Sequence, residues 1–181
     1  MSLNVPQVWP SVVHMLQDAV KRSPDHTAIK CEEDSLTYRQ YAACVTGLAI
    51  ELRARGVGVG QRVALMMANS LDIAIATYAV QAAGAQLVPL NPAYTAAELA
   101  PILADADPVL LLHNTSANDS IVESSGILGR CSLVAVGEDA RRLTKWRDQP
   151  DLASSLPLPS PDVLSTLQYT GGTTGVAKGV N

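Results

Sequence analysis

The sequence predicts an α/β fold in which a mostly parallel sheet is flanked by helices. Short apolar runs recur along the chain without the polar–apolar alternation of a half-exposed strand, which is typical of strands buried on both faces. Segments with apolar residues at helical spacing separate these runs, and alternating strands and helices favour a parallel sheet with right-handed crossovers. The 181 residues are enough to bury one sizeable core.

The N-terminal part, residues 4–36, is expected to form a helix followed by a short hairpin. Apolar residues recur at helical spacing between residues 8 and 20. After them, two short apolar segments enclose the polar turn Glu-Glu-Asp-Ser at residues 32–35, which indicates a pair of short strands.

Residues 37–136 are expected to form the α/β unit itself. Thr37 and Thr95 are each followed three residues later by Gln or Glu, which is the capping-box pattern of a helix start. Ser70 can cap a further helix that ends near Gly84. The apolar runs that predict strands cover residues 62–67, 86–90, 108–112 and 132–136.

Residues 137–161 differ in character and are predicted to form a surface connection without much regular structure. Charged residues cluster between residues 138 and 151, and three prolines punctuate the Ser-rich stretch that follows. The last segment, residues 162–181, is expected to hold a strand over residues 163–169 that runs directly into a glycine-rich loop.

The segment from Tyr169 to Lys178 reads YTGGTTGVAK and is predicted to bind the phosphates of a nucleotide. Glycines let the backbone turn sharply and bring its N–H groups close to an anion. Threonine hydroxyls donate to phosphate oxygens or help to hold a metal ion, and a lysine supplies a positive charge. The candidate site residues are therefore Thr170, Gly171, Gly172, Thr173, Thr174, Gly175 and Lys178.

Two other nucleotide-binding motifs are excluded. A Walker loop requires Gly-Lys before Ser or Thr, whereas Lys178 follows Ala177 and no Gly-Lys pair occurs in the chain. A dinucleotide fingerprint follows a strand, but the nearest match, at residues 56–60, precedes its strand and has Gln61 after its third glycine.

Composition argues against several further classes of function. The formal net charge is −4, so no basic surplus exists to neutralise nucleic-acid phosphates or to hold an anionic membrane surface. No apolar stretch approaches the length of a transmembrane helix and no secretory signal opens the chain, so a cytoplasmic protein is expected. The cysteines and histidines lack the spacing of a metal site: Cys31, Cys44, Cys131, His14, His26 and His113.

Three motifs together resemble the adenylate-forming superfamily, which includes acyl-CoA synthetases, luciferases and amino-acid adenylation domains. LQYTGGTTGVAKGV, at residues 167–180, is similar to the adenosine-phosphate loop of that superfamily. GVGVGQRVALMMANS, at residues 56–70, and GAQLVPLNPAYTAAEL, at residues 84–99, are similar to its N-terminal segment and its second core motif. Within the superfamily the motifs are most similar to bacterial long-chain fatty acyl-CoA synthetases, although Ala68 and Ala177 stand where proline is common.

The resemblance implies that the chain is the first part of the large N-terminal domain of such a ligase, and it implies a two-step reaction. A carboxylate attacks the α-phosphorus of ATP–Mg²⁺ to give an acyl-adenylate and pyrophosphate, and coenzyme A (CoA) then displaces AMP to form a thioester. The seven loop residues would hold the β- and γ-phosphates, with Thr173 or Thr174 near Mg²⁺.

The resemblance places no catalytic residue within these 181 residues. The superfamily's adenine-binding aromatic-Gly-x-Thr-Glu motif, its ribose-binding Asp and its C-terminal Lys follow the loop and are not found here. The chain alone is therefore expected to be inactive as a ligase.

Other interpretations stay open at this point. The acid can be aromatic, short-chain or an amino acid instead of a fatty acid, and the loop can belong to a non-catalytic nucleotide-binding module or to a structural fragment. The expected partners are small molecules, namely ATP, a carboxylic acid and CoA, and no nucleic acid. Peripheral contact with a membrane and the oligomeric state are left open.

Overall fold

The computed structural model describes residues 8–114, 126, 129, 131–137, 140–170 and 178–181. Its centre is a four-stranded sheet in the order β4-β3-β5-β6, in which every neighbouring pair is parallel. These strands begin and end within two residues of the predicted runs, so the α/β prediction is confirmed. They are β3 (Arg62–Met66), β4 (Gln86–Pro89), β5 (Leu110–Asn114) and β6 (Ser132–Val136).

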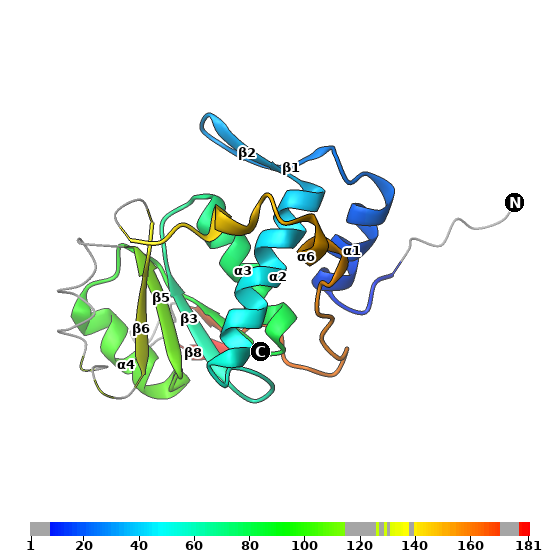
Figure 1. Cartoon of the computed structure of the whole chain (residues 1–181). Coiled ribbons are helices and arrows are strands. Elements are labelled where there is room, and N and C mark those ends of the chain that lie inside the picture. Colours follow the sequence, from blue (N-terminus) through cyan, green and yellow to red (C-terminus); the bar gives the residue numbers. More distant parts are fainter. Residues whose placement is uncertain (1–7, 115–125, 127–128, 130, 138–139, 171–177) are drawn as a thin grey trace, which may run out of the picture.

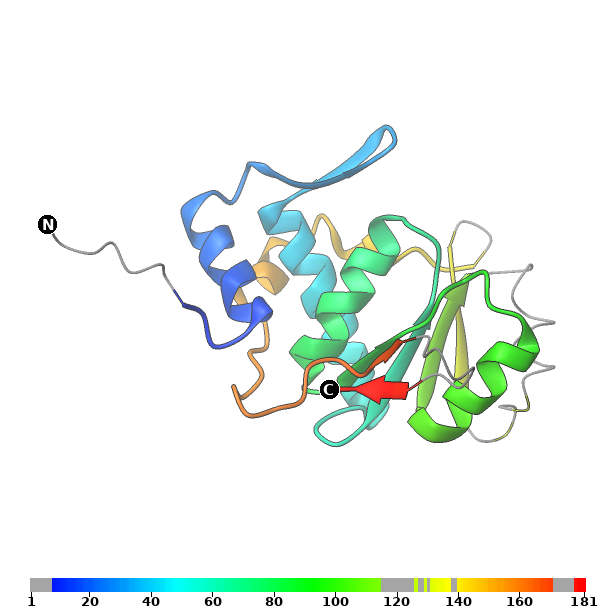
Figure 2. The same cartoon turned by 180° about the vertical axis from the view of Figure 1, so that it is seen from behind.

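Helices cover both faces of this sheet, with α2 and α3 over one face and α4 over the other (Figures 1 and 2). Successive residues of β3 therefore belong to different clusters: Val63 and Leu65 lie under α2 and α3, and Ala64 and Met66 lie under α4. Apolar contacts on both faces explain why the strand shows no polar alternation. The helices are α2 (Tyr38–Ala54), α3 (Leu71–Ala83) and α4 (Ala96–Ala106).

The helix starts follow the capping signals in the sequence. Thr37 and Thr95 form complete capping boxes before α2 and α4. Ser70 caps α3, which ends at Gly84 in a left-handed conformation with φ of 89°. All three predicted starts are confirmed. Within the described ranges, no helix combines the length and the apolarity needed to cross a membrane.

The N-terminal part forms the predicted helix and hairpin. α1 (Val12–Arg22) is followed by β1 (Thr27–Cys31) and β2 (Asp34–Thr37), which pair in antiparallel fashion. Val13 and Leu16 of α1 are buried in the cluster that α2 and α3 form with the sheet. The N-terminal part therefore extends one face of the core.

The connection at residues 137–161 is more regular than the sequence predicted. It contains the 3₁₀ helix η1 (Leu143–Trp146) and the helix α6 (Pro150–Ser154), and both contact α2. Leu143 is fully buried, and its N–H donates to Asp72 Oδ1 at 2.6 Å. The prediction of a surface connection without much regular structure was wrong for residues 143–154, because an isolated apolar residue among charged ones carries no periodicity that reveals its burial. Residues 155–161 contain no helix or strand, as predicted.

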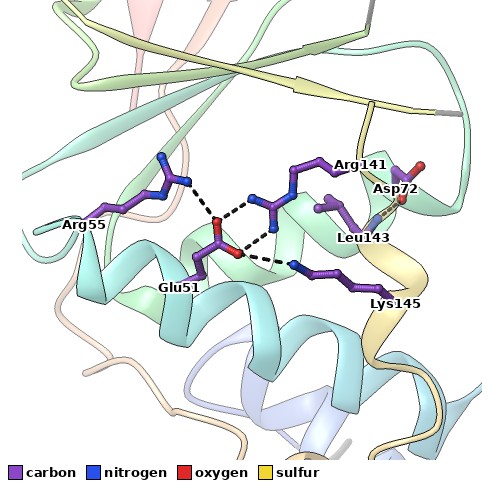
Figure 3. A network of polar contacts seen from close by, with 6 residues as sticks. All are labelled: Glu51, Arg55, Asp72, Arg141, Leu143 and Lys145. Carbon is purple, nitrogen blue, oxygen red and sulfur yellow. Dashed lines mark hydrogen bonds and ion pairs between the residues drawn. The ribbon is translucent and has the colours of Figure 1, made fainter. Parts of the chain in front are cut away.

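A polar network fastens this connection to α2 (Figure 3). Glu51 of α2 accepts hydrogen bonds from both terminal nitrogens of Arg141, while Arg55 and Lys145 lie within ion-pair distance of the same carboxylate. The hydrogen bonds from Arg141 hold the pKa of Glu51 well below its ordinary value, at about 2. Since Glu51 and Arg141 are 90 positions apart, no local pattern in the sequence identifies the pair.

Candidate phosphate-binding site

Two short strands flank the glycine-rich loop. β7 (Gln168–Thr170) and β8 (Lys178–Val180) form an antiparallel pair in which Thr170 lies directly opposite Lys178. Both residues are exposed, and the Thr170 hydroxyl and the Lys178 ammonium group can donate hydrogen bonds to phosphate oxygens. The structure therefore brings the first and last predicted site residues together. The other five lie outside the described residues: Gly171, Gly172, Thr173, Thr174 and Gly175.

The segment that leads into β7 is fastened to the edge of the central sheet. Leu87 of β4 donates its N–H to the Ser165 carbonyl at 2.9 Å, and Leu167 donates its N–H to the Leu87 carbonyl at 2.8 Å. Between them, Thr166 forms a parallel bridge with Leu87. The regular strand is shorter than the predicted 163–169, yet the entry to the loop has a fixed place beside β4.

Tyr169 ties the same strand to α4. Its side chain is 6% exposed and packs in the apolar cluster beneath that helix. The Tyr169 hydroxyl donates to Asp105 Oδ2 at 2.5 Å. Burial, together with the Asp105 carboxylate, raises the pKa of the Tyr169 phenol, so the phenol remains a protonated donor at neutral pH.

Gly179 leaves room for the Tyr169 ring on the opposite strand. A Cβ at Gly179 would lie 3.0 Å from Leu167 Cδ1 and 3.3 Å from the Tyr169 ring. Both neighbours are buried, so neither can move away freely. Glycine is therefore the residue that allows β7 and β8 to pair this closely at the root of the loop.

Polar side chains hold the chain that leaves β8. Gln86 Nε2 donates to Asn181 Oδ1 at 2.7 Å, and Gln86 Oε1 accepts a hydrogen bond from Arg62 Nε at 3.0 Å. The Arg62 guanidinium also donates to the Ala106 carbonyl, at the end of α4, at 2.9 Å. Both ends of the loop are thus connected to the sheet and to α4.

Sequence reasoning located the loop but missed the residues that hold its ends. Asp105 is exposed near the end of α4, where no local pattern marks it, yet its carboxylate accepts a hydrogen bond from the hydroxyl of the buried Tyr169. Gln86 offered a usable signal, because a polar residue at the start of an apolar run is costly to bury without partners. The long separation along the chain hid the identity of those partners.

The described residues contain no group of three or more His, Cys, Asp or Glu side chains that could hold a metal ion. Thr173 and Thr174, which are predicted to lie near Mg²⁺, belong to the part of the loop that is not described. The site as described is therefore a strand pair with two exposed hydrogen-bond donors, Thr170 and Lys178, at the base of its connecting loop.

Comparison with known proteins identifies the family of the chain. The family model for AMP-binding enzymes matches residues 16–181. Phosphinothricin tripeptide synthetase PhsC of Streptomyces viridochromogenes is 36% identical over 166 residues, which cover 92% of this chain and 15% of PhsC.

Solved structures with similar folds include two with bound ligands. ATP-bound MatB from Rhodopseudomonas palustris has a TM-score of 0.73 at 28% identity, covering 95% of this chain and 34% of MatB. The nonribosomal peptide synthetase FmoA3, in its α-methyl-L-serine-AMP bound form, has a TM-score of 0.73 at 25% identity, covering 99% of this chain and 18% of FmoA3.

The chain thus spans only a minor part of each of these relatives, from 15% of PhsC to 34% of MatB. The family match nevertheless runs through nearly the whole chain and includes the glycine-rich loop with both of its flanking strands. The chain therefore belongs to the AMP-binding enzyme family of the adenylate-forming superfamily.

Proposed function

We propose that the chain provides the phosphate-binding part of an ATP-dependent ligase that activates a carboxylic acid as an acyl-adenylate. The observation that carries this proposal concerns the two residues that bound the loop. Its two ends, Thr170 and Lys178, are exposed and paired, while the strands around them are fastened to β4 and α4. A phosphate-binding loop requires such a fixed base, since donors that are already in place lose less freedom when the ligand binds.

The proposed role of the loop is to hold the β- and γ-phosphates of ATP. Backbone N–H groups and threonine hydroxyls would donate to phosphate oxygens, and the Lys178 ammonium would offset their charge. Bound Mg²⁺ would neutralise further phosphate charge, with Thr173 or Thr174 beside it. The loop residues in these roles are Thr170, Gly171, Gly172, Thr173, Thr174, Gly175 and Lys178.

In the proposed reaction, a carboxylate oxygen bonds to the α-phosphorus of ATP. The bond from the α-phosphorus to the oxygen that leads to the β-phosphate breaks, and pyrophosphate leaves with that electron pair. Negative charge therefore builds up on the group that the loop holds. Electrostatic stabilisation of this departing charge is the main contribution that a protein makes to phosphoryl chemistry.

For the acid, the relatives favour an amino acid. PhsC is named as a tripeptide synthetase, and FmoA3 holds an amino-acid adenylate. A fatty acid remains the second candidate, because the strand and loop motifs at residues 62–67, 91–99 and 169–179 resemble long-chain fatty acyl-CoA synthetases. CoA as the acceptor of the acyl group belongs to that second candidate.

Nucleotide binding is the direct test of the loop. If the chain binds ATP–Mg²⁺, a ligand concentration of 100 times Kd should raise its free energy of unfolding by about 2.7 kcal/mol. Lys178→Ala should weaken this stabilisation, because it removes the cation at the loop. Lys145→Ala is the matched control, since Lys145 contacts Glu51 in the network on α2. No stabilisation of the unmodified chain by ATP–Mg²⁺ would contradict the proposal.

The substrate is identified by acid-dependent exchange of pyrophosphate into ATP. The exchange is measured with the full-length natural protein. Amino acids, fatty acids and aromatic acids are supplied in turn, and exchange with an amino acid is the expected result. The 181 residues by themselves should give no exchange, because the adenine-binding motif and the C-terminal Lys do not occur among them. Exchange above background by these 181 residues would contradict this expectation and would show that they contain catalytic groups in addition to the loop.

A further inference from the structure

Tyr169 is the point at which the strand pair of the loop enters the core. Within β7 and β8, Tyr169 is buried and the other residues are exposed. The ring packs against the apolar cluster that includes Leu99 and Leu103 of α4. The next residue along the chain, Thr170, is the first predicted phosphate ligand. A displacement of Tyr169 would therefore also move Thr170 and its pairing with Lys178.

Asp105 sets the position of Tyr169 along the surface of α4. Apolar packing alone is non-directional, so a ring in a cluster can tilt or slide at little cost. The hydrogen bond from the Tyr169 hydroxyl to Asp105 Oδ2, at 2.5 Å, fixes both the distance and the direction. Asp105 is itself held by α4, which packs on the sheet through Leu99, Ile102 and Leu103.

We propose that Tyr169 is a positioning residue of the nucleotide site, and that its hydrogen bond to Asp105 holds β7 so that the exposed Thr170, paired with Lys178, is in place to meet a phosphate group. The inference rests on the proposed function and adds residues to it that do not themselves touch the nucleotide. Its physical basis is preorganisation: a site whose supporting contacts are loosened must be ordered by the ligand, and its affinity falls accordingly.

Tyr169→Phe is the central variant, because it removes the hydroxyl and keeps the ring. A hydrogen bond to a charged group contributes enough to expect an increase of roughly threefold to tenfold in the Kd of ATP–Mg²⁺. Inorganic tripolyphosphate should lose affinity by a similar factor, since the effect acts through the phosphates. Both values are measured by titration calorimetry on the 181-residue chain.

Two variants of Asp105 separate the hydrogen bond from the charge. Asp105→Asn keeps a side-chain oxygen that can accept from the Tyr169 hydroxyl and should retain most of the affinity. Asp105→Ala removes the acceptor and should match Tyr169→Phe. In the double variant, Asp105→Ala should add little to Tyr169→Phe, because the same interaction is already lost.

Tyr41→Phe is the matched control. Tyr41 is 5% exposed, and its hydroxyl donates to the Ala74 carbonyl at 2.9 Å. It lies on α2, over the opposite face of the sheet from Tyr169. Tyr41→Phe should lower the thermal stability of the nucleotide-free chain while the Kd of ATP–Mg²⁺ stays unchanged.

The possible results separate the inference from the proposed function. If the unmodified chain binds neither ATP–Mg²⁺ nor tripolyphosphate, the proposed function fails and the inference fails with it. If the chain binds and Tyr169→Phe binds equally well, the inference alone is overturned and Tyr169 is a packing residue. Loss of affinity in Tyr169→Phe and Asp105→Ala, with Asp105→Asn retaining affinity, supports the inference.

Discussion

Gly47 lies within α2, where glycine is ordinarily weaker than alanine by about 1 kcal/mol. Its surroundings reverse that preference. A Cβ built at Gly47 would lie 2.4 Å from the Trp146 ring of η1, far inside van der Waals contact. The absence of a side chain at Gly47 is therefore what allows the connection at residues 137–161 to cross α2 closely.

Gly47→Ala is expected to destabilise the chain, although it improves the helix propensity of α2. Overpacking against a partly buried ring costs about 1–3 kcal/mol. Gly58→Ala is the control, because a Cβ at Gly58 meets no atom within 4 Å. The free energy of unfolding of each variant is measured in urea and compared with that of the unmodified chain. An unchanged or higher value for Gly47→Ala would show that the Trp146 ring does not pack against this position.

Among the elements, α2 and the connection at residues 137–161 are joined by charge as well as by apolar packing. Arg141 and Lys145 come from the connection, and both approach the Glu51 carboxylate of α2 (Figure 3). Hydrogen bonds from Arg141 lower the pKa of Glu51 from 4.5 to about 2. Because this pKa is lower in the folded chain than in the unfolded chain, the pair stabilises the fold above the unfolded value and loses that effect as the pH falls towards 2.

Glu51→Gln is therefore expected to reduce the free energy of unfolding at neutral pH, by about 1–2 kcal/mol after allowance for solvent screening. The difference between the two proteins should shrink as the pH falls from 5 towards 2, where the unmodified carboxyl group also becomes neutral. Glu33→Gln, which alters an exposed residue of the β1–β2 turn, serves as the control. A difference that is constant over this pH range would contradict the assignment to charge.

For the whole molecule, the central sheet joins the two main apolar clusters. Alternate residues of β3, β4 and β5 belong to opposite clusters, as Val63 and Ala64 illustrate. Neither cluster can lose its strands without exposing the other. The chain is therefore expected to unfold as one cooperative unit.

Cooperative unfolding is tested with two probes. Fluorescence of Trp146, followed in a Trp9→Phe variant so that one indole reports, monitors the face of α2 and η1. Far-UV circular dichroism monitors the helices on both faces. The two urea transitions should coincide, whereas a separate early transition in either signal would show that one face opens independently.

Local signals in the sequence were enough to predict the three capped helices and the parallel sheet. The capping residues Thr37, Ser70 and Thr95 act on the adjacent backbone, and apolar runs such as residues 62–67 are continuous in the sequence. Both signals are local, so they can be recognised without the tertiary structure. The prediction that the glycine-rich loop binds phosphate also rests on local signals, because its glycines, threonines and lysine lie within one short segment. The phosphate-binding roles of all seven loop residues, Thr170 and Lys178 included, stay predictions.

The distant residues that support that loop, and the segment that crosses α2, became known only from the folded chain. Tyr169 is hydrogen-bonded to Asp105, 64 positions away in the sequence, and Glu51 to Arg141, 90 positions away. Such pairs depend on how the elements pack, because a polar side chain gives the same sequence signal whether it faces water or a partner. Burial removes water as the alternative partner and makes the specific contact necessary, and burial is a property of the folded chain.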